Sequence, residues 1–129
     1  MKRLLTACVA VLGVIFCVGF ILPVERPPIR ITAADNTRHL DVTVSLFDLQ
    51  PSYRWVGIYA CTADRSEDMQ TYCNYFWEAR STHPTRADQN QYPFPLRNVP
   101  GGLIVITAEV WDIDDNVLAR AVIPYNKRR

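Results

Sequence analysis

The sequence predicts an all-β protein, a seven-stranded antiparallel sandwich, preceded by a single transmembrane helix. Residues 4–22 are apolar and carry no charged side chain, whereas apolar and polar residues alternate from Ile29 onward. That period of two is the period of β-strands. Pro, Gly, Asn and Asp residues divide the second part into short segments, and none of these has the spacing of an amphipathic helix. About 100 residues follow the apolar segment, enough for one small domain.

The apolar segment, Leu4 to Leu22, is long enough to cross a membrane. A helix of its length spans roughly 28 Å, close to the ~30 Å hydrocarbon core of a bilayer. It exceeds the usual apolar region of a cleaved signal peptide, so we expect an uncleaved anchor, with cleavage after Gly19 as the alternative. Lys2 and Arg3 outweigh the charges that follow, which predicts a cytoplasmic N-terminus and a periplasmic or extracellular C-terminal domain.

One side of this helix is expected to be a stripe of small side chains. The stripe has spacings of four, three and four residues and consists of Thr6, Ala10, Gly13 and Cys17. Small residues let two membrane helices approach closely, so the stripe predicts packing against another membrane helix. The alternative is that membrane helices are generally rich in small residues.

Residues 23–28 form a proline-rich linker of about 20 Å in an extended conformation, which keeps the following domain near the membrane. The sandwich is expected over residues 29–126, followed by a basic tail at 127–129. Alternation places the strands at residues 29–33, 40–46, 53–60, 71–78, 94–96, 104–110 and 117–123. Pro93 and Pro95 confine the fifth strand to a sheet edge.

Two polar segments interrupt this pattern. Residues 62–70 are expected to form a loop. The run from Ala79 to Tyr92 has almost no aliphatic residues and is too long for a simple turn, which predicts a mobile loop.

The C-terminal part contains Val-Pro-Gly-Gly, an alternating strand, the segment Trp-Asp-Ile-Asp-Asp-Asn-Val and a closing strand. This pattern resembles the last hairpin of fibronectin type III-like and other immunoglobulin-like domains. Trp55, on the third expected strand, is similar to the core tryptophan of immunoglobulin domains. The resemblance implies an immunoglobulin-like sandwich over residues 29–125. It implies no particular function, because this sandwich serves many.

Cys61 and Cys73 flank the first polar loop, at the ends of consecutive strands. We expect them to form a structural disulfide, which indicates an oxidising compartment such as a periplasm. A redox-active or metal-binding thiol pair is the alternative, although the CxxC spacing and clustered histidines typical of such sites do not occur.

Asp112, Asp114 and Asn116 have the 1, 3, 5 spacing of the oxygen ligands of a calcium loop. The glycine and glutamate expected later in such a loop are missing, and Asp and Asn are also favoured in tight hairpins for backbone reasons. They are a weak calcium candidate, and a simple hairpin turn is the alternative.

Catalysis and cofactor binding have little support. The two histidines, His39 and His83, are far apart in sequence, and no nucleophile motif accompanies either of them. We therefore expect no enzyme, no cofactor and no small-molecule substrate. The net charge of +1 is spread evenly along the chain, which gives no support to nucleic-acid binding.

Aromatic residues gather in the fourth expected strand. The candidates for an interface are Tyr72, Tyr75, Phe76 and Trp77. Large aromatic side chains dominate protein interfaces, and they also fill cores, which is the alternative here.

Together these features predict an accessory subunit of a larger membrane complex, such as a respiratory or photosynthetic one. Its partners would be the membrane and integral membrane subunits. The alternative is an anchored adhesion or recognition module that binds a ligand through its loops.

Overall fold

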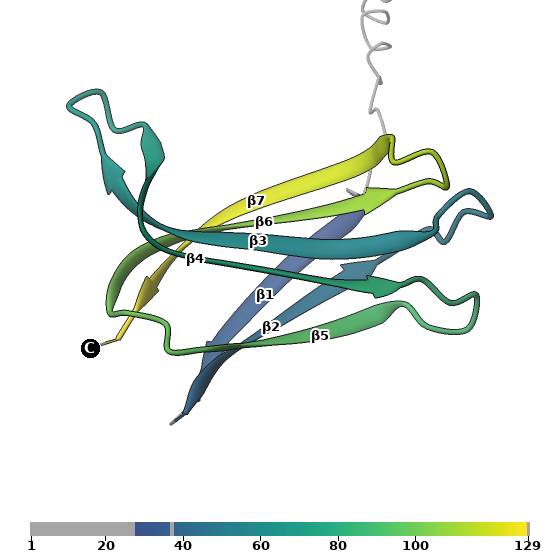
Figure 1. The fold of residues 1–129 in the computed structure, drawn as a ribbon, viewed down its shortest axis with the longest axis horizontal. Coiled ribbons are helices and arrows are strands. Elements are labelled where there is room, and N and C mark those ends of the chain that lie inside the picture. Colours follow the sequence, from purple (N-terminus) through teal and green to yellow (C-terminus); the bar gives the residue numbers. More distant parts are fainter. Residues whose placement is uncertain (1–27, 37, 129) are drawn as a thin grey trace, which may run out of the picture.

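The protein is an all-β sandwich in the computed structural model, which describes residues 28–36 and 38–128. Its seven strands are β1 (Ile29–Asp35), β2 (His39–Leu46), β3 (Trp55–Arg65), β4 (Thr71–Pro84), β5 (Gln91–Arg97), β6 (Gly102–Trp111) and β7 (Val117–Lys127). They form two antiparallel sheets with the orders β1-β2-β5 and β4-β3-β6-β7 (Figure 1). The predicted all-β fold of seven antiparallel strands is confirmed, and β5 lies at a sheet edge as predicted.

Residues 28–36 and 38–128 contain no helix long and apolar enough to span a membrane. The predicted span at residues 4–22 lies outside those ranges. So does its stripe of Thr6, Ala10, Gly13 and Cys17.

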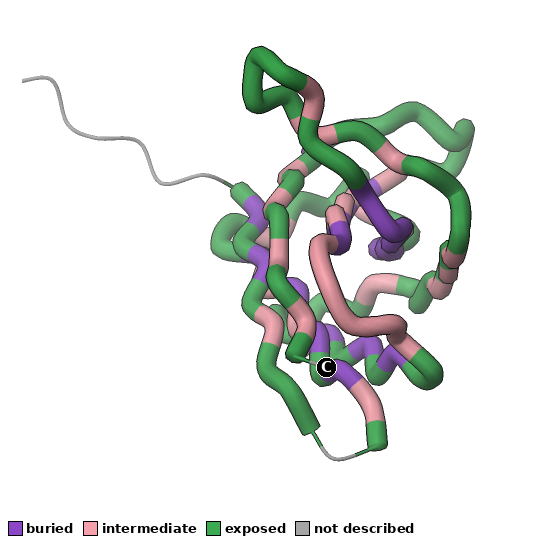
Figure 2. The backbone as a smooth tube through the Cα atoms, turned by 90° about the vertical axis from the view of Figure 1, so that its left-hand side faces the viewer, coloured by how far each residue is buried: buried purple, intermediate pink, exposed green. Residues whose placement is uncertain are grey.

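The core lies between the two sheets, where every second residue of a strand points inward. β2 contributes Leu40, Val42, Val44 and Leu46, and β6 contributes Ile104, Ile106, Ala108 and Val110, all of them buried. β5 adds Tyr92, Phe94 and Leu96. Figure 2 shows buried positions alternating with half-buried or exposed ones along the backbone. The alternation read from the sequence therefore identified the inner faces of these strands.

The hairpin formed by β3 and β4 is much longer than expected. β3 continues through residue 65, and β4 runs to Pro84, so residues 62–65 of the predicted loop at 62–70 and residues 79–84 of the predicted loop at 79–92 are strand. Residues 79–84 pair with residues 55–60 of β3. β4 is an edge strand whose residues are exposed or half-buried throughout, so it needs few aliphatic side chains. The predicted mobile loop is wrong, and the connection is reduced to residues 85–90.

Two residues expected inside the sandwich lie outside it. Trp55 is 43% exposed, because Val56, Ile58 and Ala60 take the inner face of β3 and leave Trp55 on the outer one. Val117 is exposed because a register shift at Trp111 displaces it from the inward-facing set of β7.

Backbone hydrogen bonds gather several connections at one end of the sandwich, here called the Pro28 end. Phe47 N donates to Pro28 O at 3.1 Å, and Arg54 N donates to Trp111 O at 2.8 Å. Thr85 N donates to Arg54 O at 2.9 Å. The opposite end carries the β3–β4 hairpin tip and the end of β7 (Figure 1).

At that opposite end a polar cluster joins β1 to β7. Tyr125 donates its hydroxyl to the Asp35 carboxylate at 3.0 Å, and Lys127 Nζ lies 3.2 Å from the same carboxylate. Lys127 therefore belongs to the last strand and helps to close the sandwich, although the sequence placed it in a basic tail.

Candidate interaction site

The pairing of β3 with β4 is interrupted by a bulge of four residues. Cys61 pairs with Glu78, and the next pair is Ala63 with Cys73. Residues 74–77 therefore lie opposite Thr62 alone, and we call them the β4 bulge. Such insertions bend a strand and redirect its side chains.

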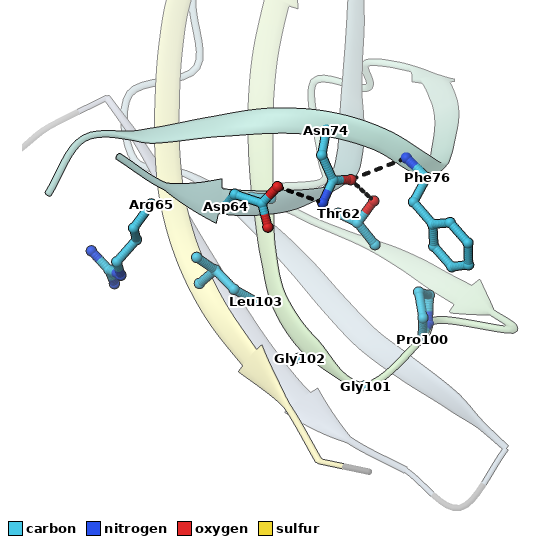
Figure 3. Close-up of a pocket in the computed structure, with 10 residues that line it drawn as sticks. Thr62, Asp64, Arg65, Asn74, Phe76, Pro100, Gly101, Gly102 and Leu103 are labelled. Atoms are coloured by element: carbon cyan, nitrogen blue, oxygen red, sulfur yellow. Dashed lines mark hydrogen bonds between the residues drawn. The ribbon is translucent and has the colours of Figure 1, made fainter. Parts of the chain in front are cut away.

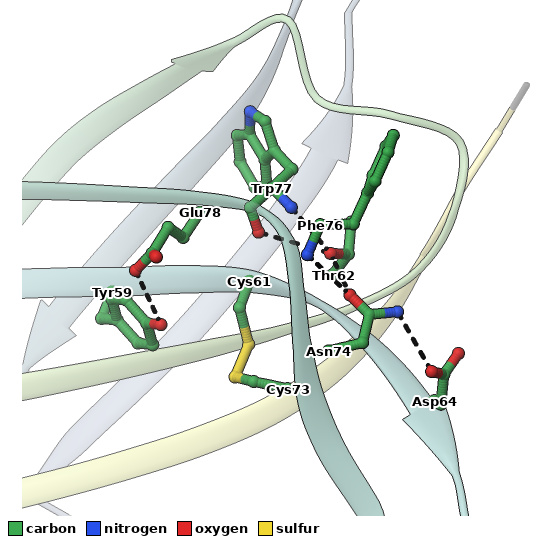
Figure 4. Close-up of a disulfide and its surroundings, with 9 residues drawn as sticks. All are labelled: Tyr59, Cys61, Thr62, Asp64, Cys73, Asn74, Phe76, Trp77 and Glu78. Carbon is green, nitrogen blue, oxygen red and sulfur yellow. Dashed lines mark hydrogen bonds between the residues drawn. A yellow bond between two sulfur atoms is a disulfide. The ribbon is translucent and has the colours of Figure 1, made fainter.

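Thr62 holds the bulge in place from the facing strand (Figure 4). Its hydroxyl accepts a hydrogen bond from Trp77 N at 3.0 Å and contacts the Asn74 side-chain oxygen. That oxygen also accepts from Phe76 N at 3.0 Å. The Asn74 amide nitrogen donates to the Asp64 carboxylate at 3.2 Å. The bulge thus satisfies its backbone through side chains, as a segment that has left the sheet ladder must.

A disulfide adjoins the same segment. Cys61 and Cys73 are bonded, with their Cα atoms 5.7 Å apart, which confirms the disulfide predicted from the sequence (Figure 4). It ties β4 to β3 immediately before the bulge begins. The covalent bond on one side and the Thr62 hydrogen bonds on the other restrict the conformations that the bulge can adopt.

The bulge and its flank present aromatic side chains to solvent. Tyr72, Tyr75 and Phe76 are 51%, 66% and 81% exposed. Trp77 is half-buried and packs against the core. Of the four predicted interface residues, three are therefore exposed to solvent, while the fourth packs against the interior.

Tyr75 has a φ of 59°, in the left-handed region that side chains other than glycine rarely adopt. Backbone strain of this kind persists only where the surroundings enforce it, and it concentrates at functional sites.

A shallow cleft of about 420 Å³ lies beside the bulge, between β4 and the turn before β6. Phe76 and Asn74 form one wall, and Pro100 and Gly101 form the other (Figure 3). A partner that packs on Phe76 would therefore meet a recess that can receive one of its side chains.

The sequence did not predict the bulge. Regular alternation would put Tyr75 and Trp77 on one face and Phe76 on the other. That alternation does not hold here, because four residues of β4 lie opposite one residue of β3. The only local signal is Asn74, a residue depleted in strands, in the middle of an aromatic run.

The weak calcium candidate forms the turn between β6 and β7. The Asp112 carboxylate accepts hydrogen bonds from Asp114 N and Asn116 N, both at 2.9 Å, and from the Asn116 amide at 3.1 Å. These bonds, led by the one from the Asn116 backbone, lower the pKa of Asp112. Both carboxylate oxygens are thus engaged in shaping the hairpin.

The two histidines lie on different sheets. His39 pairs with Asp41 at 2.7 Å on β2, and His83 contacts Pro93 O at 3.2 Å from β4. Residues 28–36 and 38–128 contain no group of three His, Cys, Asp or Glu side chains placed to hold a metal ion.

No family model matches this chain, and no curated protein matches it. Among solved structures, a putative beta-galactosidase from Bacteroides fragilis is similar over 78% of the chain, at 18% identity and a TM-score of 0.42. The match covers 16% of that much longer protein. At this level of similarity, no property of that protein is transferred to this chain.

Proposed function

We propose that this protein is a non-enzymatic accessory subunit of a larger membrane complex and that it docks on a partner subunit through the β4 bulge. The observation that carries the proposal is the exposure of Tyr72, Tyr75 and Phe76 on a segment held by a disulfide and a buried threonine. Ordering a flexible segment on binding costs conformational entropy. Here the disulfide and the hydrogen bonds of Thr62 already restrict the segment before any partner arrives.

Binding energy at protein interfaces concentrates in a few aromatic or arginine side chains near the centre of the contact. Holding such side chains in place reduces the entropy lost on association, and so raises affinity without additional contacts. The cleft beside Phe76 supplies the recess that a hot spot on a partner usually fills. The proposed interface is therefore Tyr72, Tyr75 and Phe76 with the adjoining cleft, while Trp77 supports it from below.

We further propose that the fold is an immunoglobulin-like sandwich of the fibronectin type III kind. The strand order supports this proposal, because β2 pairs with β5 in one sheet and β3 pairs with β6 in the other. These are the B–E and C–F pairings of immunoglobulin-like domains. Trp55 does not support it, since it lies on the outer face.

The proposed localisation is a single-pass membrane protein with the sandwich in the periplasm or outside the cell. The apolar segment ends six residues before Pro28, and a disulfide is favoured by an oxidising compartment. Thr62 lies seven residues along β3 from Trp55 at the Pro28 end, a distance of about 23 Å. The bulge is thus at the end of the domain opposite to the connection with the anchor, which favours a protein partner over lipid headgroups.

The experiment is extraction of native membranes in a mild detergent, followed by size separation and mass spectrometry of the proteins that co-migrate with this chain. We expect a stoichiometric large complex. The double variant Tyr72→Ala/Phe76→Ala should release the chain from it.

The matched control is Val122→Ala, which truncates an exposed apolar side chain on β7, away from the bulge, and should leave the complex intact. A wild-type chain that migrates alone would refute the accessory-subunit proposal. A complex that survives the double variant would refute the bulge as its docking surface.

A further inference from the structure

Two tryptophans lie side by side on the outer face of the four-stranded sheet, at the Pro28 end. Trp55 and Trp111 are direct partners in the register of β3 and β6. Directly opposite residues of antiparallel strands have Cβ atoms only about 5 Å apart, so the two indoles are neighbours. They are remote from the β4 bulge, and neither belongs to the core. Trp55 is 43% exposed, so part of this pair is accessible to a ligand.

The sheet is shaped to receive one of these rings. Gly57 pairs with Glu109, one step along the outer face from the tryptophan pair. A Cβ atom added at Gly57 would lie 2.9 Å from Trp111 Cζ3 and 2.7 Å from Thr82 Cγ2. Only glycine therefore lets the Trp111 indole extend across β3. The ring lies along the sheet and forms one wall of a recess.

The recess beside the tryptophans has a volume of about 400 Å³ and is lined by Trp55, Thr82, Trp111 and Asp115. A second recess of about 210 Å³ over Gly57 shares Thr82 and Trp111 with it. The two recesses therefore adjoin each other, and the first is lined by two tryptophans and an aspartate.

The charged residues that line the two recesses, Arg80, Glu109 and Asp115, differ in their contacts. Glu109 is bound by Arg120, whose Nε lies 2.6 Å from its carboxylate, and Arg80 stacks at 4.3 Å over the Tyr59 ring. Both arginines are thus engaged with groups of the protein. The carboxylate of Asp115 makes no hydrogen bond or ion pair within the described part of the chain. The hairpin segment 111–117 has three aspartates and neither lysine nor arginine.

We propose that Trp55, Trp111 and Asp115 form a binding site for a small organic cation of the quaternary ammonium class. The face of an indole ring carries negative electrostatic potential and attracts such cations, and the nearby carboxylate adds a full negative charge. A quaternary ammonium has no N–H group, so it needs no hydrogen-bond acceptors from the walls. This suits a recess whose largest surfaces are aromatic. The proposal is independent of docking through the β4 bulge.

The ligand for the test is choline, compared with 3,3-dimethylbutan-1-ol, in which carbon replaces the charged nitrogen. The full-length protein is kept in a polyoxyethylene detergent, which carries neither ammonium groups nor sugars, and the ligand is followed by NMR. We expect choline to bind at least tenfold more tightly than its neutral analogue. Glucose is the third ligand tested. It carries no positive charge and should not bind.

Three variants separate the contributions. Trp55→Leu and Trp111→Leu keep apolar bulk but remove the ring, and each should weaken choline binding at least tenfold. Asp115→Asn removes the charge and should weaken it severalfold, while asparagine tolerates the φ of 65° found at this position. Met69→Ala, which truncates an exposed apolar side chain in the β3–β4 turn at the opposite end, is the control and should leave binding unchanged. Thermal unfolding of each variant establishes that it is folded.

Equal binding of choline and the neutral analogue would overturn the proposal, as would glucose binding that depends on Trp111. Unchanged choline affinity in Trp111→Leu and Asp115→Asn would overturn it as well. Binding to vesicles distinguishes the two sources of a quaternary ammonium group, a lipid headgroup and a free solute. Retention on phosphatidylcholine but not on phosphatidylglycerol vesicles, lost in Trp111→Leu, supports the site and assigns it to a lipid headgroup. Binding of free choline without such retention supports the site and assigns it to a solute.

Discussion

Replacing Thr62 by valine tests whether the β4 bulge is held by a single hydroxyl. Thr62 is 7% exposed, and valine has nearly the same shape, so the change removes one polar group without opening a cavity. Trp77 N, which donates to that hydroxyl at 3.0 Å, would lose its acceptor. An unsatisfied buried donor costs about 1–3 kcal/mol. Burying a methyl in place of the hydroxyl recovers up to ~0.8 kcal/mol.

The net loss expected for Thr62→Val is therefore about 0.2–2.2 kcal/mol when the methyl group recovers its full ~0.8 kcal/mol, which lowers Tm by up to roughly 18 °C in a domain of this size. The assay is equilibrium unfolding of the full chain in non-ionic detergent, followed by tryptophan fluorescence, to which Trp77 contributes directly. Thr107→Val, a half-buried threonine on the outer face of β6, is the matched control and should change stability by less than about 0.5 kcal/mol. Equal stability of the two variants would refute the assigned role of Thr62.

Three further predictions concern stability. Replacing Cys61 and Cys73 with serine opens a 12-residue loop and should lower the free energy of unfolding by about 3 kcal/mol relative to the oxidised wild type, measured by denaturant titration, while the reduced wild type should unfold like the variant. Gly57→Ala forces contacts under 3 Å and should cost about 1–3 kcal/mol in the same assay, so a neutral result would contradict the close packing described for this position. Burial opposes ionisation of Asp35, but hydrogen bonds led by that from Lys127 outweigh it and lower its pKa. The stabilisation by ionised Asp35 is present above the ordinary pKa of 3.8 and is lost as the pH falls below it. The free energy of unfolding should therefore fall less in Asp35→Asn than in the wild type between about pH 5 and about pH 2.5.

The sequence alone determined the all-β class, the seven strands and most of the core. Leu40 to Leu46 and Ile104 to Val110 show the reason. On a strand packed on one face, burial follows from a period of two, which is local and can be read directly. The disulfide between Cys61 and Cys73 could be predicted for a similar reason, since the two residues are close in sequence and lie on the two strands of one hairpin.

Tertiary structure alone decided which polar segments are strands. Residues 79–84 have no hydrophobic signal, because an edge strand gains its stability from pairing with β3 and not from its own burial. The length of β4 therefore depends on a neighbour that local composition does not describe. The exposure of Trp55 has a related cause, because only the assembled sheet shows which face of β3 meets the core.

The β4 bulge is the clearest case. Its residues 74–77 are defined by their register against Thr62, and register is a relation between two strands. The sequence identified the aromatic residues, and the pairing decided that Tyr75 and Phe76 point to solvent while Trp77 is anchored in the interior. The same holds for the neighbouring indoles of Trp55 and Trp111, which are 56 positions apart in the chain and meet only because β3 pairs with β6.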